Sequence, residues 1–532
     1  MKIFFDAKVI IDTIIRIDEF PNSLSLLNTL LDSPSCSLWI SSISINNVES
    51  AISKSVSKKK VQETFELLNR KFSIIPFRRS TFIKAMENWD AYFEDAVQMS
   101  SAEEMGMDVI VSRNKDHFKK SKVLVLTPDE FLDRWDAGEI CQVNQVPFMD
   151  LRAQYHQIFN EIDDKIADVI SRSAFILGNY VDEFEQEFAK VQGASYCIGV
   201  SSGTDALHLS LLALNIGLGD AVFLPVNTFF ATAEAVVLTG ATPVFVDIEP
   251  DTFNMDPDQL EKAIQESGIR SQESGVRGRE PEVQHVVPKA IIPVHLYGQS
   301  ADMHQILALA RKYDLEVIED CAQAHLSHWQ NRKVGNFGTF GAFSFYPGKN
   351  LGAFGEAGAV TTNDSDLFAK AQSISRHGET TRYFHQYFGH NYRMENFQGA
   401  VLSAKLKYLP QWTTQRQENA ALYSKLLSGI DEICIPTTRA GAGHVFHLYV
   451  IRARNREALQ AYLQSRNVST GLHYPVPLHL QKACAHFGYK AGDFPIAEKA
   501  ASEILSLPMF PELTEAKIQY VCECIREFYE KF

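Results

Sequence analysis

The sequence predicts an α/β protein made of two separate α/β blocks. Short apolar segments of strand length recur along the chain, and stretches with helical spacing lie between them. With 532 residues, the chain is too long for one ordinary domain. A polar stretch over residues 136–145, DAGEICQVNQ, is interpreted as a linker. We therefore expect one domain over residues 1–135 and a longer block over residues 146–532.

The first block opens with an apolar, β-branched stretch, KIFFDAKVIID. Segments with helical spacing follow, and short strands return at DVIVSRN and KVLVLTP. This alternation of strands and helices predicts a small parallel sheet.

The second block contains four apolar segments that are typical of buried strands: AVFLPV, PVFVDI, AIIPVHLYG and EVIED. Helical spacing between them again indicates an α/β arrangement. Residues 265–271 (QESGIRS) and 272–278 (QESGVRG) form a tandem repeat with little apolar content. Two copies are too few for a solenoid, so this stretch is interpreted as a solvated loop insertion.

Composition excludes several classes of function. The net charge of −14 argues against a general binder of nucleic acids or membranes, which are polyanionic, although a local basic patch remains possible. No apolar run approaches the roughly 20 residues that a membrane span needs. The eight cysteines are scattered, so reduced thiols are expected in place of a zinc site. We expect a cytoplasmic protein.

Two segments of the second block carry residues that suit a flat cofactor. Lys349 follows an apolar strand in FSFYPGKNLGAFGEAGAV, where glycines allow the backbone to approach a ligand closely. Asp320 ends the EVIED strand, and the carboxyl ends of parallel strands face the usual ligand crevice. A carboxylate there would keep the ring nitrogen of pyridoxal phosphate (PLP) protonated, and Gln323 could reach the ring hydroxyl. Taken singly, Lys349 also fits a surface loop, and Asp320 a helix N-cap.

Two further segments fit the same cofactor. Gly203 and Thr204 lie in CIGVSSGTDALHLSLLAL, where a strand meets a turn and an apolar helix. The free N–H groups at such a helix start suit a phosphate. Phe229, after the strand end in PVNTFFATAEAV, could stack on the cofactor ring. Each segment alone is weak evidence, because such turns are common and phenylalanine is more often simply part of the core.

Together and in this order, the segments resemble the sugar aminotransferases of the DegT/DnrJ/EryC1/StrS family. The resemblance covers residues 146–532 and includes PFMDLRAQY, HLYGQSADM, FGHNYRMENFQGAVLSAKLKYL and GLHYPVPLHLQ. It implies the PLP-dependent transferase fold type I, with a large PLP-binding domain over residues 146–400 and a small C-terminal α+β domain over residues 401–532. The insertion at residues 265–278 is the clear departure from the family pattern.

The resemblance also implies a role for each matching residue. Lys349 would form the covalent link to PLP and move a proton between cofactor and substrate carbons. The other cofactor contacts would be Asp320 at the ring nitrogen, Gln323 at the ring oxygen, Phe229 stacked on the ring, and Gly203, Thr204 and Ser344 at the phosphate. Asn391 matches a residue that reaches the phosphate in the neighbouring subunit, which implies a homodimer with shared active sites. His295 and His473 stand in matching motifs without an assigned role.

The activity implied by the resemblance is transfer of an amino group from an amino acid, glutamate, to a nucleoside-diphosphate keto-deoxysugar. The relatives that this chain resembles in EILSLPMFPEL and YRMENFQGAVL act on dTDP-3-keto-6-deoxyhexoses. A PLP-dependent sugar dehydratase is the alternative, but relatives of that kind carry histidine where this chain has Lys349. A catalytically dead scaffold would require loss of Lys349 or Asp320, and both are present.

Residues 1–135 resemble the PIN domain, a small metal-dependent ribonuclease fold, in KIFFDAKVIID, FEDAVQMSSAEEMGMDVIVSRN and VLTPDEFL. The resemblance implies a site for Mg²⁺ or Mn²⁺, hard ions that prefer oxygen ligands. The candidate ligands are Asp6, Asp95 and, less directly, Glu49 and Asp116. Lys8, Tyr92 and His117 depart from the family pattern, and a lysine there would compete with a metal ion. An RNA-cleaving module and a degenerate remnant therefore both remain open.

Overall fold

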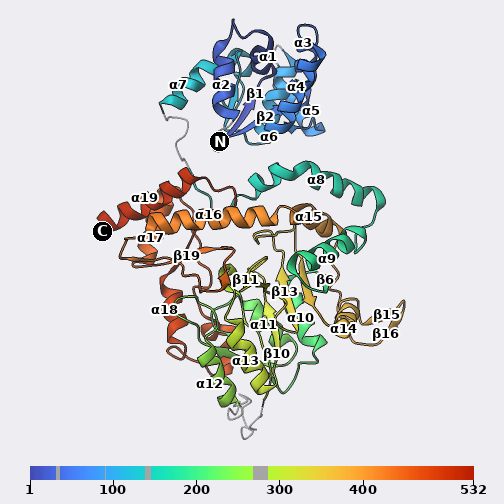
Figure 1. Cartoon of the computed structure of the whole chain (residues 1–532), viewed down its shortest axis with the longest axis vertical. Helices are drawn as coiled ribbons and strands as arrows, with labels where there is room; N and C mark the ends of the chain where they lie inside the picture. The colour runs from blue at the N-terminus through green and yellow to red at the C-terminus, as the bar shows by residue number, and fades with distance from the viewer. Residues whose placement is uncertain (32–35, 90–91, 138–144, 268–285, 532) are drawn as a thin grey trace. The chain divides into compact units, whose positions relative to one another are not determined.

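The protein is described here by a computed structural model that covers residues 1–31, 36–89, 92–137, 145–267 and 286–531 (Figure 1). The chain forms two compact units, Met1–Asn144 and Gln145–Phe532. Most of the predicted linker and of the predicted repeat insertion, residues 138–144 and 268–278, lies outside the described residues. Among the helices that are described, none is both long and apolar enough to cross a membrane.

The N-terminal unit contains, in its described part, a five-stranded parallel sheet with the order β3-β2-β1-β4-β5. Its strands are β1 (Lys2–Phe5), β2 (Ser37–Ser41), β3 (Phe72–Ile75), β4 (Val109–Val111) and β5 (Leu124–Leu126). Its helices are α1 (Ala7–Ile15), α2 (Pro21–Leu31), α3 (Ser42–Ile52), α4 (Lys58–Lys71), α5 (Arg79–Asn88), α6 (Phe93–Glu104) and α7 (Pro128–Asp136). Asp136, expected in the linker, is therefore helical.

The opening stretch KIFFDAKVIID divides into a strand and a helix at Asp6. The side chain of Asp6 accepts a hydrogen bond from the backbone N–H of Lys8, so that Asp6 caps α1 and ends the extended segment. Within β1, Ile3 and Phe5 pack on one core cluster and Phe4 on another, as the alternation of side chains along a strand requires. The sheet is therefore covered on both faces.

The C-terminal unit is built, in its described part, on a seven-stranded sheet with the order β6-β14-β13-β10-β9-β7-β8. Strand β14 runs antiparallel to both neighbours and the other strands run in one direction. The strands are β6 (Tyr196–Val200), β7 (Asp220–Pro225), β8 (Thr242–Val246), β9 (Val287–Ile291), β10 (Glu316–Asp320), β13 (Phe340–Ser344) and β14 (Gly358–Thr362). The four strands predicted in this block correspond to β7, β8, β9 and β10, and the α/β class is confirmed.

Helices cover both faces of this sheet (Figure 1). On one face, the core cluster includes residues of α10 (Gly203–Ala213), α11 (Phe230–Leu238) and α14 (Ser365–Ser375). On the other face, α12 (Pro257–Ser267) packs on β7, β8 and β9, and α13 (Met303–Tyr313) packs on β10. Helices α9 (Asn179–Gln192) and α15 (Asn396–Leu406) share a core cluster with β6, β13 and β14. The carboxyl ends of six strands thus meet at one edge of a sheet that is buried on both sides.

The last part of the chain forms a smaller antiparallel sheet of β17 (Ile433–Cys434), β19 (Tyr449–Ala453) and β20 (Ile504–Leu507). It is accompanied by α16 (Leu409–Leu427), α17 (Arg456–Ser465), α18 (Pro495–Glu503) and α19 (Glu515–Lys531). Residue 400, the expected domain boundary, lies inside α15, which packs along α9 and along α8 (Leu151–Arg172). The short strands are β11 (His328–Trp329), β12 (Arg332–Lys333), β15 (Glu379–Thr381), β16 (Phe384–His385) and β18 (Ala442–Gly443).

Candidate active site

A cavity of about 750 Å³ lies where β6, β7, β10 and β13 end in the C-terminal unit. Most of the residues predicted to bind the cofactor line this cavity: Gly203, Thr204, Phe229, Asp320, Gln323, Ser344 and Lys349. They come from segments that are up to 146 positions apart in the sequence, and the shared direction of the parallel strands brings them to one edge.

Lys349 lies in the loop that follows β13. Its backbone N–H donates to the carbonyl of Tyr346 over 2.8 Å, and the loop then turns back sharply. A side chain at Gly352 would collide with the carbonyl oxygen of Pro347, so only glycine permits this turn. Burial lowers the pKa of Lys349 to about 8, although the nearby carboxylate of Asp320 opposes the change. The amine is therefore closer to its nucleophilic, neutral form than an exposed lysine would be.

Asp320 is the last residue of β10, and its carboxylate is buried at the cavity wall. Its Oδ2 accepts a hydrogen bond from the hydroxyl of Thr232 over 2.9 Å, and Oδ1 accepts one from the backbone N–H of Ala322 over 3.1 Å. Burial raises the pKa of Asp320, while these two donors and the positive charge of Lys349 lower it. A buried carboxylate that is held by two donors suits a partner that shares a proton with it, as a pyridine ring nitrogen does.

The start of α10 forms the end of the cavity that suits a phosphate. Ser202 caps the helix by accepting the backbone N–H of Asp205, whose carboxylate in turn accepts the hydroxyls of Ser201 and Ser202. A Cβ atom on Gly203 would lie 2.6 Å from Cβ of Ser344, so glycine allows the end of β13 to approach the helix start. Backbone N–H groups and the Ser344 hydroxyl thus face the same region.

Gln323 has a defined orientation. Its Oε1 accepts the backbone N–H of Tyr297 over 2.6 Å, and its Nε2 donates to the hydroxyl of Tyr474 over 2.6 Å. Because a backbone N–H can only donate, the amide oxygen must face Tyr297 and the amide nitrogen must face the cavity. Tyr474 lies beside the ring of Phe229, with the ring centroids 6.1 Å apart.

Several cavity residues were not among the sequence predictions. Thr232 and Tyr474 are the clearest cases, and His447, Phe148, Met149 and Glu356 also line the wall. His473, which was noted without a role, is a lining residue as well. Burial and the nearby Lys349 lower the pKa of His473 to about 4, so its imidazole is neutral at physiological pH.

The residues present fit PLP. A lysine of lowered pKa, a buried carboxylate, an oriented amide, an aromatic ring and a helix start line one cavity, and Gly203 leaves room where a side chain would block the approach. The family model of the DegT/DnrJ/EryC1/StrS aminotransferases matches residues 156–526, which is most of the chain. The chain belongs to this family.

Curated relatives of the family match about the same region. A protein named pleiotropic regulatory protein, from Geobacillus stearothermophilus, is 46% identical over 73% of this chain and 99% of its own length. UDP-N-acetyl-3-dehydro-alpha-D-glucosamine 3-aminotransferase from Acidithiobacillus ferrooxidans is 41% identical over 72% of this chain and 98% of its own. The dTDP-3-amino-3,4,6-trideoxy-alpha-D-glucose transaminase of Streptomyces venezuelae is 38% identical over 73% and 97%.

Solved structures of the family agree with the fold. The crystal structure of S. venezuelae DesV in complex with a ketimine intermediate has a TM-score of 0.68 at 38% identity, over 73% of this chain and 100% of DesV. The fold type I expected for the second block is thereby confirmed. The family match begins at residue 156, so the N-terminal unit lies outside it.

Asn391 is placed differently from the other predicted cofactor residues. It is exposed, its Oδ1 accepts a hydrogen bond from Nε of Arg393 over 2.8 Å, and it is absent from the described residues that line the cavity of its own chain. Its expected service to a neighbouring subunit stays a prediction.

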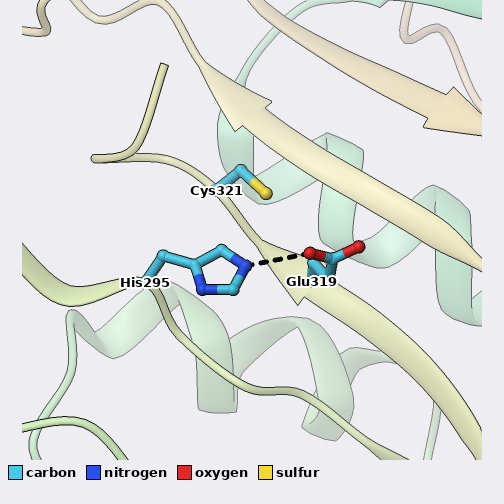
Figure 2. Close-up of side chains that lie close together, drawn as sticks. All are labelled: His295, Glu319 and Cys321. Carbon is cyan, nitrogen blue, oxygen red and sulfur yellow. Dashed lines mark hydrogen bonds and ion pairs between the residues drawn. The ribbon is translucent and has the colours of Figure 1, made fainter. Parts of the chain in front are cut away.

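His295 lies behind Asp320, outside the cavity lining formed by the described residues. It is buried close to Glu319 and Cys321, and the three side chains are near enough to share a metal ion (Figure 2). The ring nitrogens of His295 and the carboxylate oxygens of Glu319 are already engaged in hydrogen bonds, however. The carboxylate of Glu319 accepts the backbone N–H groups of Gly335, Phe337 and Gly338, and faces Nε2 of His295 at 3.0 Å. His295 and Glu319 therefore belong to a hydrogen-bond network that uses the atoms a metal ion would need.

In the N-terminal unit, the candidate metal ligands are tied to protein groups. Oδ2 of Asp6 accepts the hydroxyl of Ser112 over 2.6 Å. Oδ2 of Asp95 lies 2.6 Å from Nδ1 of His117 and 3.9 Å from Nζ of Lys8. Among the residues that the structure describes, neither acid belongs to a group of three ligands close enough to hold a metal ion.

The two weaker candidates are exposed, whereas Asp6 and Asp95 are buried. Glu49 is exposed on α3, and Asp116 is exposed and paired with Lys119 at 3.0 Å. Glu94 is instead the acid that interacts electrostatically with Asp6 and Asp95, and its burial together with their negative charge raises its pKa. The sequence signal for Glu94 was its position next to Asp95 at the start of α6.

Proposed function

We propose that the C-terminal unit is a PLP-dependent aminotransferase that moves an amino group from an amino acid, glutamate, to a nucleoside-diphosphate keto-deoxysugar. The observation that carries this proposal is the shared cavity of Lys349 and Asp320, in which a lysine of lowered pKa faces a buried carboxylate. Histidine at the lysine position would favour dehydration, and this chain has lysine.

PLP, when bound, would supply an electron sink that stabilises negative charge on a substrate carbon. Asp320 would hold a proton at the ring nitrogen, and Thr232 and the N–H of Ala322 would hold the Asp320 carboxylate. Nζ of Lys349 would take a proton from the α-carbon of the amino-acid donor and return it to a nearby cofactor carbon. This proton transfer needs a base that is already in position, and Lys349 meets that need. Gln323 would direct its amide nitrogen at the ring oxygen, and Ser344, Gly203 and Thr204 would bind the phosphate.

The keto-sugar substrate is a dTDP-3-keto-6-deoxyhexose in this proposal. Two of the relatives described above, one using a UDP-sugar and one a dTDP-sugar, are named for chemistry at C3. Neutral His473 and the rings of Phe229 and Tyr474 give the cavity a wall of aromatic and uncharged polar groups, which suits a sugar. The active form would be a homodimer in which Asn391 contacts the phosphate in the other subunit.

For the N-terminal unit, the proposal is a PIN-like domain with weak or absent nuclease activity. Two observations support it: His117 and Lys8 lie against the carboxylate of Asp95, and Ser112 binds that of Asp6. These groups would have to be displaced before Mg²⁺ or Mn²⁺ could bind.

The test of the aminotransferase is a substrate panel. The purified chain is incubated with glutamate and with each of several dTDP- and UDP-linked 3-keto and 4-keto sugars, and the aminated product is followed by mass spectrometry. The Lys349→Ala variant serves as the control. We expect a dTDP-3-amino sugar from the parent and none from the variant. Water loss from a sugar without amination would contradict the proposal.

A further inference from the structure

His295 and Glu319 form a buried pair directly beneath the cofactor-facing end of β10. Both side chains are fully buried, and Nε2 of His295 lies 3.0 Å from Oε2 of Glu319. Nδ1 of His295 accepts the backbone N–H of Ala301 over 3.0 Å. Because an N–H can only donate, Nδ1 carries no proton, and the imidazole proton is therefore on Nε2, facing the carboxylate.

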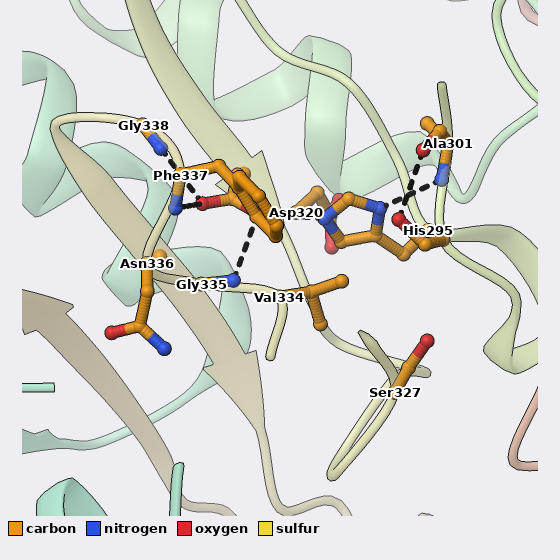
Figure 3. A network of polar contacts seen from close by, with 12 residues as sticks. His295, Ala301, Asp320, Ser327, Val334, Gly335, Asn336, Phe337 and Gly338 are labelled. Carbon is orange, nitrogen blue, oxygen red and sulfur yellow. Dashed lines mark hydrogen bonds and ion pairs between the residues drawn. The ribbon is translucent and has the colours of Figure 1, made fainter. Parts of the chain in front are cut away.

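The carboxylate of Glu319 holds a second segment of the chain. Its Oε1 accepts the backbone N–H groups of Phe337 and Gly338 over 2.6 and 2.9 Å, and Oε2 accepts that of Gly335 over 2.8 Å (Figure 3). With His295, four donors satisfy one buried carboxylate, which offsets the cost of removing its charge from water. Few other side chains could accept hydrogen bonds from all four of these donors.

His295 also binds the main chain at Asp320. Its backbone N–H donates to the carbonyl of Asp320 over 3.0 Å, and the N–H of Asp320 donates to the carbonyl of Pro293 over 2.9 Å. His295 is therefore attached at two points: its backbone to Asp320, and its side chain to the neighbouring Glu319. A shift of the imidazole would be transmitted to the strand end that carries the Asp320 carboxylate.

The same imidazole closes the turn that orients Gln323. By accepting the N–H of Ala301, His295 joins the two ends of the segment 295–301. Within this segment Tyr297 has φ 57° and Gly298 has φ 103°, and a Cβ atom on Gly298 would lie 2.9 Å from the backbone nitrogen of His447. A non-glycine residue at positive φ needs surrounding structure to hold it. The N–H of Tyr297 then fixes Oε1 of Gln323.

We infer that His295 and Glu319 are positioning residues, which hold Asp320 and Gln323 in the orientation that the ring nitrogen and ring oxygen of PLP require. This rests on the proposed function of the cavity. The pair acts through the main chain of β10 and through the turn 295–301, and does not contact the cofactor itself.

The decisive variants are His295→Leu and His295→Gln. Leucine removes both ring nitrogens at similar volume, whereas the amide of glutamine supplies one donor for Glu319. The matched control is His479→Leu, because His479 is also buried and also lies 3.0 Å from a glutamate, Glu498, but has no bond to Asp320 or Gln323. All three proteins are prepared as the full chain with PLP.

The first readout is the visible absorbance of lysine-bound PLP, titrated with pH. We expect the titration midpoint of His295→Leu to move relative to the parent, because the Asp320 carboxylate no longer faces the ring nitrogen in the same way. His295→Gln should return the midpoint toward the parent value, and His479→Leu should leave it unchanged. The second readout is amide hydrogen exchange, which should become faster in residues 295–301 of His295→Leu only.

The rate with glutamate alone gives a third readout, because it needs no sugar. We expect the limiting rate constant of this single-turnover reaction to fall about tenfold in His295→Leu, with little change in the glutamate concentration that gives half the limiting rate. If His295→Leu melts at a lower temperature but keeps the parent's absorbance midpoint and rate, the pair is merely structural and the inference is wrong. The proposed function would fail separately, if the parent binds PLP and reacts with glutamate but aminates none of the sugars.

Discussion

The hydroxyl of Thr232 donates a hydrogen bond to Oδ2 of Asp320 over 2.9 Å, across the gap between the start of α11 and the end of β10. Both residues are buried. The bond stabilises the charged form of a carboxylate whose pKa burial raises. Thr232 therefore favours the ionised Asp320 that a protonated ring nitrogen needs as its partner.

Replacing Thr232 by valine should lower kcat and leave PLP bound. Loss of the donor removes a contribution of about 0.5–1.5 kcal/mol, so we expect a decrease of about twofold to tenfold. Thr239→Val is the control, since Thr239 lies at the other end of α11 and donates to the carbonyl of Val236. Steady-state kinetics of both variants would show whether the effect depends on contact with Asp320; equal rates for Thr232→Val and the parent would contradict the role.

Replacing Asp320 by asparagine should have a larger effect. The amide keeps the shape of the side chain but carries no negative charge, so the ring nitrogen would lose its proton and the electron sink would weaken. We expect PLP to remain bound and kcat to fall by more than tenfold, each factor of ten being about 1.4 kcal/mol of barrier. Absorbance measures the bound cofactor and turnover measures the rate. Activity within a few-fold of the parent would show that Asp320 has another role.

The pH dependence of PLP capture tests the state of Lys349. The attacking species is the neutral amine, and burial lowers the pKa of Lys349 to about 8. The rate at which the cofactor-free chain forms its covalent link with PLP should rise with pH up to about 8 and then level off. Stopped-flow absorbance between pH 6 and 10 would measure this rate. A rate that keeps rising toward the ordinary lysine pKa would contradict the assignment, and Lys349→Ala should form no link.

A subunit-mixing experiment tests the expected role of Asn391. If Asn391 serves the neighbouring active site, Lys349→Ala and Asn391→Ala fall in the same active site when one subunit of each variant is combined in a dimer. One site of the mixed dimer then carries both changes and the other carries neither. We expect activity to reappear on mixing two poorly active variants, and sedimentation should report a dimer. A fully active monomer would rule out shared sites.

The C-terminal site could be predicted largely because its residues stand at strand ends. Asp320 ends EVIED and Ser344 ends β13, and the direction of parallel strands brings such positions together whatever their separation in the sequence. Thr232 was missed because it is one of several small residues in an apolar helix, and only its contact with Asp320 distinguishes it. Tyr474 was missed because the antiparallel part of the chain returns it to the cavity by a path that no local pattern reveals.

The His295 network shows a different limit. The motif HLYG drew attention to His295, but its role depends on hydrogen bonds from Ala301 and to Glu319, and on three N–H groups in residues 335–338. None of these partners follows from periodicity or composition. The tight turn 295–301 likewise depends on the positive φ of Tyr297, and a tyrosine in the sequence does not predict a positive φ.

The N-terminal unit gives the last prediction. Asp95 lies between His117 and Lys8, so a divalent ion would have to displace two protein groups to reach its carboxylate. Because affinity for such ions follows the number of available carboxylate oxygens, we expect Mg²⁺ and Mn²⁺ to bind weakly and to leave the melting temperature of the unit nearly unchanged.

The matched variant is Lys8→Asn combined with His117→Asp, which removes both neighbouring groups and adds a carboxylate. Calorimetry with Mn²⁺ should show tighter binding by this variant than by the parent, and Asp95→Asn in the same background should abolish the gain.

Residues 146–532 alone should keep transaminating, because every assigned PLP residue lies there. RNA cleavage by the parent should be slow or undetectable. Robust Mg²⁺-dependent cleavage by the parent that disappears in Asp6→Ala would show that Lys8 and His117 do not block the metal.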